Sequence, residues 1–225
     1  MSAFPFDIVA FDLDGTLADT SPDIAAALNL MLGDLGRPSL EPGHIRSLIG
    51  DGAKSLIRKA LAATGQASEA LVEKGYPIYL QRYGDDICGG TTRFPSVEEA
   101  LDGLAQRGVT LALCTNKPEM LTRALLDALG WAERFPVLIG GDTLPWRKPD
   151  PRPLIETRDR AGGGRMAFVG DSMIDAETAR AAGVPFVAVS FGFSDRPAAE
   201  FGADAVIDGY AELIPALERL GPSRS

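Results

Sequence analysis

Short apolar runs alternate with amphipathic stretches along most of the chain. The run Ile8-Val9-Ala10-Phe11 is typical of a strand that is buried on both faces of a parallel sheet. Helices of roughly 10–15 residues between such strands indicate βαβ units, and therefore an α/β fold with a doubly wound, Rossmann-like parallel sheet. The predicted strands are 8–11, 109–114, 137–139, 166–169 and 186–189, and the predicted helices that alternate with them are 96–106, 118–129, 151–160, 174–182 and 210–220.

A different pattern follows the first strand. Ser21-Pro22-Asp23 predicts a helix start with Ser21 as the cap, and apolar residues then recur at helical spacing. No strand is indicated as far as residue 83, so this part of the chain is predicted to be an all-helical insert. We therefore expect a helical cap domain at 18–88 and an α/β catalytic core formed by 1–17 and 89–225; the helices of the insert are predicted from residue 21 to 32, at 44–49, at 53–61 and at 69–83.

Composition narrows the functional classes. The chain has 225 residues and a formal net charge of -9, with no cluster of Lys and Arg, which argues against a nucleic-acid or acidic-membrane partner. Its two cysteines, Cys88 and Cys114, form neither a disulfide framework nor a metal-ligand set. The sequence shows no basic segment followed by an apolar one at its start and no apolar run of about 18 residues, so a cytoplasmic protein is expected.

Polar residues follow several of the predicted strands at the point where each ends. Ligands of an open parallel sheet bind beyond the carboxyl ends of its strands. Loops from distant parts of the sequence are therefore expected to present carboxylates, a hydroxyl, an amide and one ammonium group to the same crevice. These residues are Asp12 and Asp14 after the first strand, Thr115 and Asn116 after the second, Asp171 and Asp175 after the fourth, and Lys148 in the loop before a helix.

The charges of this set indicate phosphate chemistry. Clustered carboxylates raise each other's pKa, and a hard dication such as Mg2+, which prefers oxygen ligands and phosphate, relieves the repulsion. With Lys148 as a second cation, a carboxylate could attack phosphorus and form an aspartyl phosphate that water hydrolyses. Asp14 could protonate the leaving oxygen and later deprotonate the water, while Thr16 and Thr115 could hold phosphoryl oxygens.

The same residues carry a family resemblance. Asp12-Leu13-Asp14-Gly15-Thr16-Leu17 resembles the first motif of the haloacid dehalogenase-like superfamily. Thr115-Asn116, Lys148-Pro149 and Gly170-Asp171-Ser172-Met173-Ile174-Asp175 resemble its second, third and fourth motifs, in the same order. The resemblance covers nearly the whole chain, and it implies that the helical insert is a cap of the C1 type.

The resemblance also implies a role for each matching position. It makes Asp12 the nucleophile, Asp14 the acid and base, and Lys148 the residue that bridges the nucleophile and the phosphate. The implied metal ligands are Asp12, the backbone carbonyl of Asp14, and Asp171, with Asp175 behind them as an occasional ligand, and the implied phosphate-binding residues are Thr115 and Asn116.

Within the superfamily, several segments resemble the phosphoglycolate phosphatase group. Two departures are Met173-Ile174, where the group often has a polar pair, and Ser96, where a glycine is common. The resemblance implies Mg2+-dependent hydrolysis of 2-phosphoglycolate, a small phosphorylated metabolite, to glycolate and phosphate. The segments that carry it are Thr20-Ser21-Pro22-Asp23, Leu48-Ile49-Gly50-Asp51-Gly52-Ala53, Thr115-Asn116-Lys117-Pro118 and Lys148-Pro149-Asp150-Pro151.

Other interpretations remain open at this level. The substrate could be a sugar phosphate, pyrophosphate or a nucleotide, and a phosphomutase similar to beta-phosphoglucomutase would use the same aspartates. A signalling receiver module also clusters aspartates, but it is about half as long and lacks a helical insert. The loop Gly50-Asp51-Gly52 is either a turn between helices or a loop that closes over the substrate with its N–H groups. A monomer and a homodimer are both compatible with the sequence.

Overall fold

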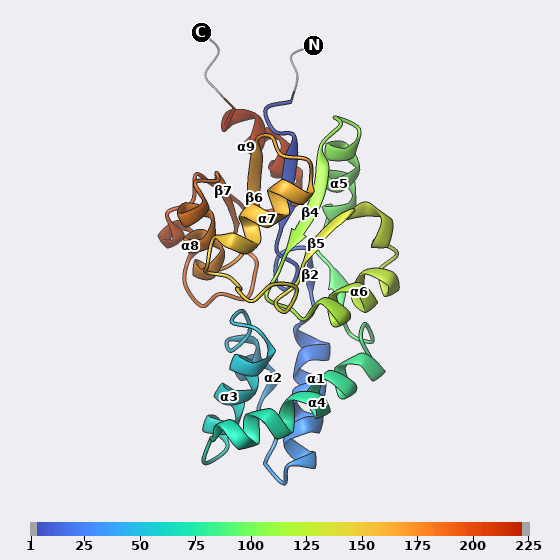
Figure 1. Ribbon diagram of the computed structural model, residues 1–225, viewed down its shortest axis with the longest axis vertical. Helices are drawn as coiled ribbons and strands as arrows, with labels where there is room; N and C mark the ends of the chain where they lie inside the picture. Colours follow the sequence, from blue (N-terminus) through green and yellow to red (C-terminus); the bar gives the residue numbers. More distant parts are fainter. Residues whose placement is uncertain (1–3, 222–225) are drawn as a thin grey trace.

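The computed structural model describes residues 4–221, which contain a six-stranded parallel sheet with strand order β5-β4-β1-β6-β7-β8. The predicted fold class, an α/β fold with a parallel sheet, is therefore confirmed. The first and last described segments of the chain lie at the same end of the molecule (Figure 1), where Gly221 packs close to Pro5. The strands are β1 (Ile8–Phe11), β4 (Thr110–Cys114), β5 (Val137–Ile139), β6 (Met166–Gly170), β7 (Phe186–Val189) and β8 (Ala205–Ile207).

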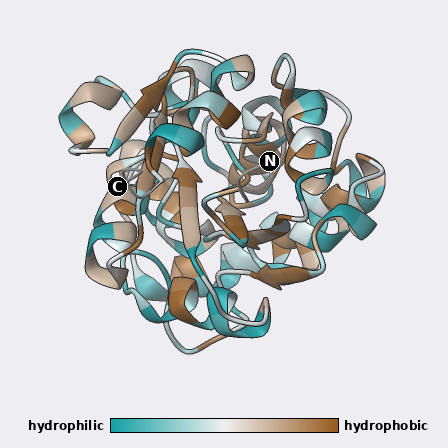
Figure 2. Cartoon of the chain, turned by 90° about the horizontal axis from the view of Figure 1, so that it is seen from above, coloured by the Kyte–Doolittle hydropathy of each residue, from teal (hydrophilic) through white to brown (hydrophobic). Residues whose placement is uncertain are grey.

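Helices cover both faces of this sheet, which explains why its strands are apolar without interruption. Alternate residues of β1 point to opposite faces: Val9 and Phe11 belong to one hydrophobic cluster, and Ile8 and Ala10 to another. In Figure 2 the strands are largely brown, while teal residues lie mainly toward the outside. The first cluster includes residues of α5 (Val97–Ala105), α6 (Glu119–Ala128) and α9 (Leu213–Arg219), and the second includes residues of α7 (Arg152–Arg160) and α8 (Met173–Ala182).

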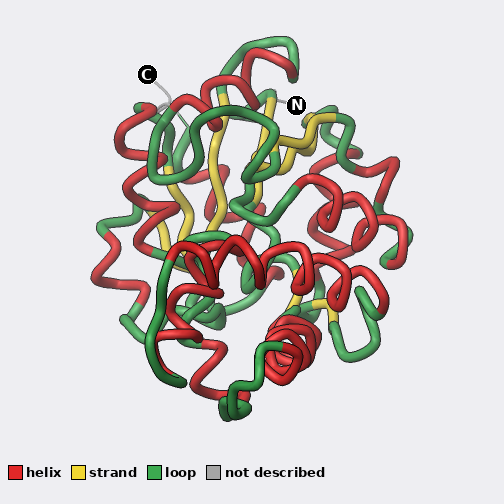
Figure 3. The backbone as a smooth tube through the Cα atoms, turned by 60° about the horizontal axis from the view of Figure 1, so that its bottom comes forward, coloured by secondary structure: helices red, strands yellow, loops and turns green. Residues whose placement is uncertain are grey.

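Four helices follow the first strand and pack around a hydrophobic cluster that is largely their own. This helical insert, residues 21–85, lies beyond the carboxyl ends of the sheet strands (Figure 1), and its helices stand in front of the strands in Figure 3. The assignment of 18–88 as a separate domain stays a prediction. The helices are α1 (Ser21–Asp34), α2 (Pro42–Arg46), α3 (Ala53–Ala63) and α4 (Glu69–Asp85).

A short antiparallel ribbon connects the insert to the sheet. It consists of β2 (Ala18–Asp19), where the chain enters the insert, and β3 (Thr92–Arg93), where it returns. The sequence did not indicate these strands because two residues are too few to produce an alternating pattern. Strand β8 was missed for a related reason: it has three residues at the edge of the sheet, and one of them, Val206, is 41% exposed.

The predicted start of the first helix is wrong by one residue. Thr20 is the N-cap and Ser21 is the first helical residue. Neither side chain caps the helix, because the Thr20 hydroxyl donates to Asp14 and the Ser21 hydroxyl donates to Asp19. Both hydroxyls therefore stabilise the chain segment that leads from the sheet into the insert.

Ser96 adopts a backbone conformation that suits glycine. Its φ is 60°, and it is the one residue other than glycine with a positive φ among residues 4–221. A side chain in the left-handed region costs energy that glycine avoids, which explains why glycine is common here in the group that the sequence resembles. Within residues 4–221, no helix combines the length and the hydropathy needed to cross a membrane.

Candidate active site

The candidate site lies where the sheet changes its direction of winding. The chain leaves β1 toward β4 and β5, but it leaves β6 toward β7 and β8, so a crevice opens between the ends of β1 and β6. Asp12 follows β1 directly, and Asp171 follows β6. The order of the strands therefore brings these two carboxylates together across 159 residues of sequence.

Three buried carboxylates meet in this crevice. Asp12, Asp171 and Asp175 each offer an oxygen, and these oxygens all lie within 4.8 Å of one another. The hydroxyl of Thr16 donates to Asp171 at 3.2 Å, and the backbone N–H of Phe193 donates to the same carboxylate at 2.7 Å. Asp171 is thus oriented from two sides. The prediction that Thr16 binds phosphate stays a prediction, since its hydroxyl donates here to a carboxylate.

Two glycines allow the chain to approach Asp171 closely. A Cβ atom on Gly15 would lie 2.4 Å from Asp171 Oδ2, and one on Gly192 would lie 2.2 Å from Asp171 Cβ. Gly15 also has a φ of 82°, in the left-handed region. The glycine in the motif after β1 is therefore required both by the turn and by the packing against the carboxylate.

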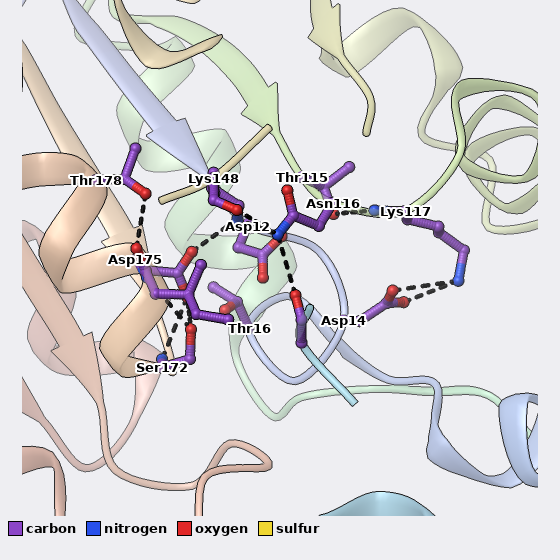
Figure 4. A network of polar contacts seen from close by, with 12 residues as sticks. Asp12, Asp14, Thr16, Thr115, Asn116, Lys117, Lys148, Ser172, Asp175 and Thr178 are labelled. Atoms are coloured by element: carbon purple, nitrogen blue, oxygen red, sulfur yellow. Dashed lines mark hydrogen bonds and ion pairs between the residues drawn. The ribbon is translucent and has the colours of Figure 1, made fainter. Parts of the chain in front are cut away.

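Lys148 lies between two of the carboxylates. Its ammonium nitrogen is 3.0 Å from Asp12 Oδ1 and 2.6 Å from Asp175 Oδ1, and its side chain is only 2% exposed. Asp175 is itself fixed at the start of α8, because its other oxygen accepts hydrogen bonds from the N–H and the hydroxyl of Ser172. The reciprocal hydrogen bond from the Asp175 N–H to the Ser172 hydroxyl completes a capping box (Figure 4).

Burial dominates the ionisation of this cluster. Burial raises the pKa of Asp12 to about 6, against the opposing effect of Lys148, and the carboxylates of Asp175 and Asp14 add to the rise. Burial and the neighbouring carboxylates also hold the pKa of Asp171 well above its ordinary value. Burial disfavours the ammonium of Lys148, but Asp12 and Asp175 overcome this effect and raise its pKa.

The cluster fits a divalent cation. Asp12 Oδ1 is buried and lies at ion-pair distance from Lys148, yet it has no hydrogen bond of good geometry within residues 4–221. An acceptor oxygen left in this state, beside two further carboxylates, is suited to a hard cation that binds oxygen. The proximity of three buried carboxylates is also unfavourable until positive charge is added.

The second predicted loop joins the sheet to the insert. The side-chain amide of Asn116 donates to the carbonyl of Gly50 and to that of Lys148, each at 3.1 Å. Its Oδ1 atom is buried and accepts no hydrogen bond within the described residues. Thr115 is buried beside it. Both residues line a cavity that Asp12 and Asp14 also line.

The loop at residues 50–52 contributes backbone to this cavity. Gly50 and Gly52 line it together with Asp12 and Asp14, and a Cβ atom on Gly52 would lie 3.1 Å from the carbonyl oxygen of Asn116. Asp51 points elsewhere and pairs with Lys59 in α3. The structure therefore brings two of the three predicted loop residues to the cavity.

Asp14 contacts residues to which the sequence analysis assigned no role. The ammonium group of Lys117 lies 2.9 Å from its Oδ1 atom, and the hydroxyl of Thr20 donates to the same oxygen at 2.8 Å. Lys117 also donates to the hydroxyl of Tyr83 in α4 at 2.6 Å. Lys117 directly follows the predicted pair Thr115-Asn116, which was a usable signal, whereas Tyr83 is indistinguishable in sequence from other apolar helix positions.

Arg46 in α2 makes a further contact between the insert and the site. Its guanidinium group lies 2.8 Å from Asp19 Oδ2, donates to the carbonyl of Gly192 at 3.1 Å, and stacks over the ring of Phe193 at 4.5 Å. Gly192 and Phe193 belong to the loop that contacts Asp171. The insert thus reaches the carboxylate cluster through this loop.

Comparison with known proteins is consistent with this geometry. Residues 9–189 match the family model described as haloacid dehalogenase-like hydrolase. The chain is 43% identical over 214 residues to a phosphoglycolate phosphatase of Pseudomonas syringae pv. tomato, covering 92% of this chain and 78% of that protein. It is 39% identical over 221 residues to a phosphoglycolate phosphatase of Agrobacterium fabrum, covering 96% and 95% of the two chains.

Solved structures show the same fold. A crystal structure of a predicted phosphoglycolate phosphatase from Haemophilus somnus superposes with a TM-score of 0.88 at 30% identity, covering 94% of this chain and 97% of that one. CbbY from Rhodobacter sphaeroides, solved in complex with phosphate, has a TM-score of 0.83 at 24% identity, covering 95% and 99% of the two chains. The second likeness concerns the fold alone.

Proposed function

The chain belongs to the haloacid dehalogenase-like hydrolase family, and from this membership we propose that it hydrolyses 2-phosphoglycolate to glycolate and phosphate, with Asp12 as the nucleophile. It is a phosphoric monoester hydrolase, as the phosphatases among its relatives support. The observation that carries the proposed mechanism is the buried group of Asp12, Asp171 and Asp175 with Lys148 between two of its members.

We assign the metal to the same group. Asp12, Asp171 and the backbone carbonyl of Asp14 would hold Mg2+, and Asp175 would stay behind them on Lys148. When bound, the ion supplies positive charge to the carboxylates and to the phosphoryl oxygens, which would otherwise repel each other.

The reaction would proceed in two steps on residues of this chain. In the first, an oxygen of Asp12 bonds to phosphorus as the bond between phosphorus and the ester oxygen breaks, and Asp14 gives a proton to the departing oxygen. In the second, water attacks the phosphorus of the aspartyl phosphate and gives a proton to Asp14, while the bond between phosphorus and the Asp12 oxygen breaks. This releases phosphate, restores the Asp12 carboxylate and returns Asp14 to its protonated form. Thr115 and Asn116 line the cavity beside Asp12 and would hold phosphoryl oxygens, while Lys148 would bridge the nucleophile and the phosphate.

The helical insert is proposed to act as a cap that covers this site. Gly50 and Gly52 in the insert line the cavity, and Asn116 in the core donates to Gly50. An insert held over the reacting atoms would exclude water during the first step and admit it for the second. The cytoplasmic location and the monomeric or homodimeric state that the sequence suggested stay predictions.

The test is phosphate release from a panel of phosphate esters in the presence of Mg2+, with Asp12→Asn as the matched control. The panel contains 2-phosphoglycolate, a sugar phosphate, a nucleotide and pyrophosphate. We expect the largest kcat/KM for 2-phosphoglycolate and a loss of at least about 1000-fold in Asp12→Asn. A larger kcat/KM for another ester would replace the substrate, and full activity of Asp12→Asn would refute the mechanism. A rearranged sugar phosphate without free phosphate would identify a phosphomutase instead.

A further inference from the structure

Two buried lysines flank Asp12, and the proposed mechanism uses only one of them. Lys148 lies on one side, where it contacts Asp12 and Asp175, and Lys117 lies on the other, where it contacts Asp14 (Figure 4). The side chain of each is only 2% exposed. Removing an ammonium group from water is costly unless anionic or polar partners replace the water. Asp14 and the hydroxyl of Tyr83 are such partners for Lys117, and they hold its charge beside the nucleophile.

We propose that Lys117 binds a second anionic group of the substrate, a carboxylate close to the phosphate, and that Tyr83 holds Lys117 in place for this role. The proposal rests on the proposed function and extends it, because it defines the substrate class as small phosphate esters that carry a carboxylate. Lys117 is then the residue that distinguishes 2-phosphoglycolate from an ester of similar size without a second charge.

The position of Lys117 in the cavity supports this role. Lys117 and Tyr83 line the same cavity as Asp12 and Asp14. A substrate bound at Asp12 would therefore lie close to Lys117 and Tyr83. Lys117 adds a positive charge on the other side of Asp12, and Asp14 is the carboxylate that balances it in this structure (Figure 4).

Lys117 can bind another partner while Asp14 keeps a hydrogen bond from Thr20. In this structure its ammonium group donates to both oxygens of Asp14, at 2.9 and 3.3 Å, and to the hydroxyl of Tyr83. Asp14 also accepts a hydrogen bond from Thr20, which would remain if Lys117 turned to the substrate. Asp14 is thus the partner of Lys117 in this structure, and the carboxylate of the substrate would replace it.

Tyr83 connects this recognition to the insert. Its side chain is buried in α4, its hydroxyl accepts from Lys117 at 2.6 Å, and its ring centre lies 4.2 Å from the ammonium nitrogen. Both contacts restrict the rotamers of a long side chain, so binding would cost less conformational entropy. The carboxylate would therefore be recognised with the insert in place over the sheet.

The charge of Lys117 suits either a carboxylate or a second phosphoryl group as the additional anion of the substrate. The choice of a carboxylate follows from the proposed function, in which the substrate is 2-phosphoglycolate. Pyrophosphate, in which the second anion is a phosphoryl group, is therefore the comparison that separates the two chemistries.

The experiment compares kcat/KM for 2-phosphoglycolate, ethyl phosphate and pyrophosphate in the wild type and in Lys117→Met. Ethyl phosphate keeps the two-carbon skeleton and lacks the carboxylate. We expect the ratio of kcat/KM for 2-phosphoglycolate to that for ethyl phosphate to fall by about 100-fold in Lys117→Met, because a charged hydrogen-bonding partner is lost for one substrate only. In Tyr83→Phe the same ratio should fall by about 10-fold, through KM. Lys74→Met makes the same substitution at an exposed position of α4 and should leave the ratio unchanged.

A binding measurement keeps the test independent of turnover and of folding. In an Asp12→Asn background, 2-phosphoglycolate should raise the Tm, and adding Lys117→Met should abolish this rise while the ligand-free protein still unfolds cooperatively. A wild type that prefers 2-phosphoglycolate, combined with an unchanged ratio in Lys117→Met, overturns this proposal and leaves the proposed function intact. If the wild type prefers pyrophosphate, both the proposed binding of a carboxylate by Lys117 and the proposed substrate are wrong. A wild type with no preference for either doubly anionic substrate over ethyl phosphate overturns both proposals.

Discussion

The raised pKa of Asp12 predicts that the protein without metal becomes less stable as the pH rises. The pKa is about 6 in the folded protein, against an ordinary value of 3.8. Between these values the folded state binds more protons than the unfolded state, so the free energy of unfolding falls as pH increases. The shift corresponds to about 3 kcal/mol, and this cost is absent below about pH 4 and complete above about pH 6. Asp12 is buried, so water screens this cost only weakly.

Mg2+ should remove most of this cost, because a bound cation stabilises the ionised carboxylate and competes with its proton. The assay is urea denaturation at about pH 4 and about pH 7, in EDTA and in excess Mg2+, for the wild type and for Asp12→Asn. The isosteric variant cannot titrate at this position, so groups distant from Asp12 cancel in the difference between the two proteins. Asp171 and Lys148, whose pKa values depend on the charge of Asp12, contribute to the difference together with Asp12 itself. In EDTA the wild type should lose about 3 kcal/mol more than Asp12→Asn across this range, and in Mg2+ the difference should shrink. Equal pH dependence of the two proteins in EDTA would refute the reasoning.

Three further predictions concern the surroundings of this cluster. Gly15→Ala should lower the free energy of unfolding by about 2 kcal/mol in urea denaturation, because its Cβ would collide with Asp171, whereas Gly108→Ala, at a φ of 77° with open space around it, should cost about half as much. Lys148→Met should reduce kcat for 2-phosphoglycolate by at least about 1000-fold, since it removes the cation beside the nucleophile, and retention of more than a tenth of kcat in a steady-state assay would contradict this. Arg46→Met should raise KM by about 10-fold with a smaller effect on kcat, because the partly exposed side chain ties the insert to the loop that contacts Asp171; an unchanged KM would show that this contact does not influence substrate binding.

The sequence predicted the carboxylate cluster because strand ends determine its position. Asp12 and Asp171 each follow an uninterrupted apolar run, and parallel strands bring their carboxyl ends to one edge of the sheet. The position of a side chain within a residue or two of a strand end is determined by where the strand ends. The same argument placed Thr115 and Asn116 correctly in space without any knowledge of the packing of helices.

The sequence could not predict the contacts that depend on how the insert packs against the sheet. Tyr83 and Arg46 lie on helices whose apolar periodicity predicts which face is buried but not which part of the sheet lies opposite. Lys54 and Arg58 follow the loop at residues 50–52 in α3, yet they pair at exposed positions with Glu73 and Glu69. A charged residue on a helix can thus be assigned to solvent or to a site only after docking is known.

The polar contacts between insert and core bear on specificity as well as on stability. Asn116 donates to the carbonyl of Gly50, and Lys117 donates to the hydroxyl of Tyr83, so consecutive residues of one core loop each hold a different helix or loop of the insert. The first contact lies beside the proposed phosphate site and the second beside the proposed carboxylate site. A substrate that engages both ends would therefore favour the docked position of the insert, whereas a simple phosphate ester engages only one. Discrimination would then arise from closure as well as from direct contact, and the ratio of kcat/KM values in Lys117→Met and Tyr83→Phe should report both contributions.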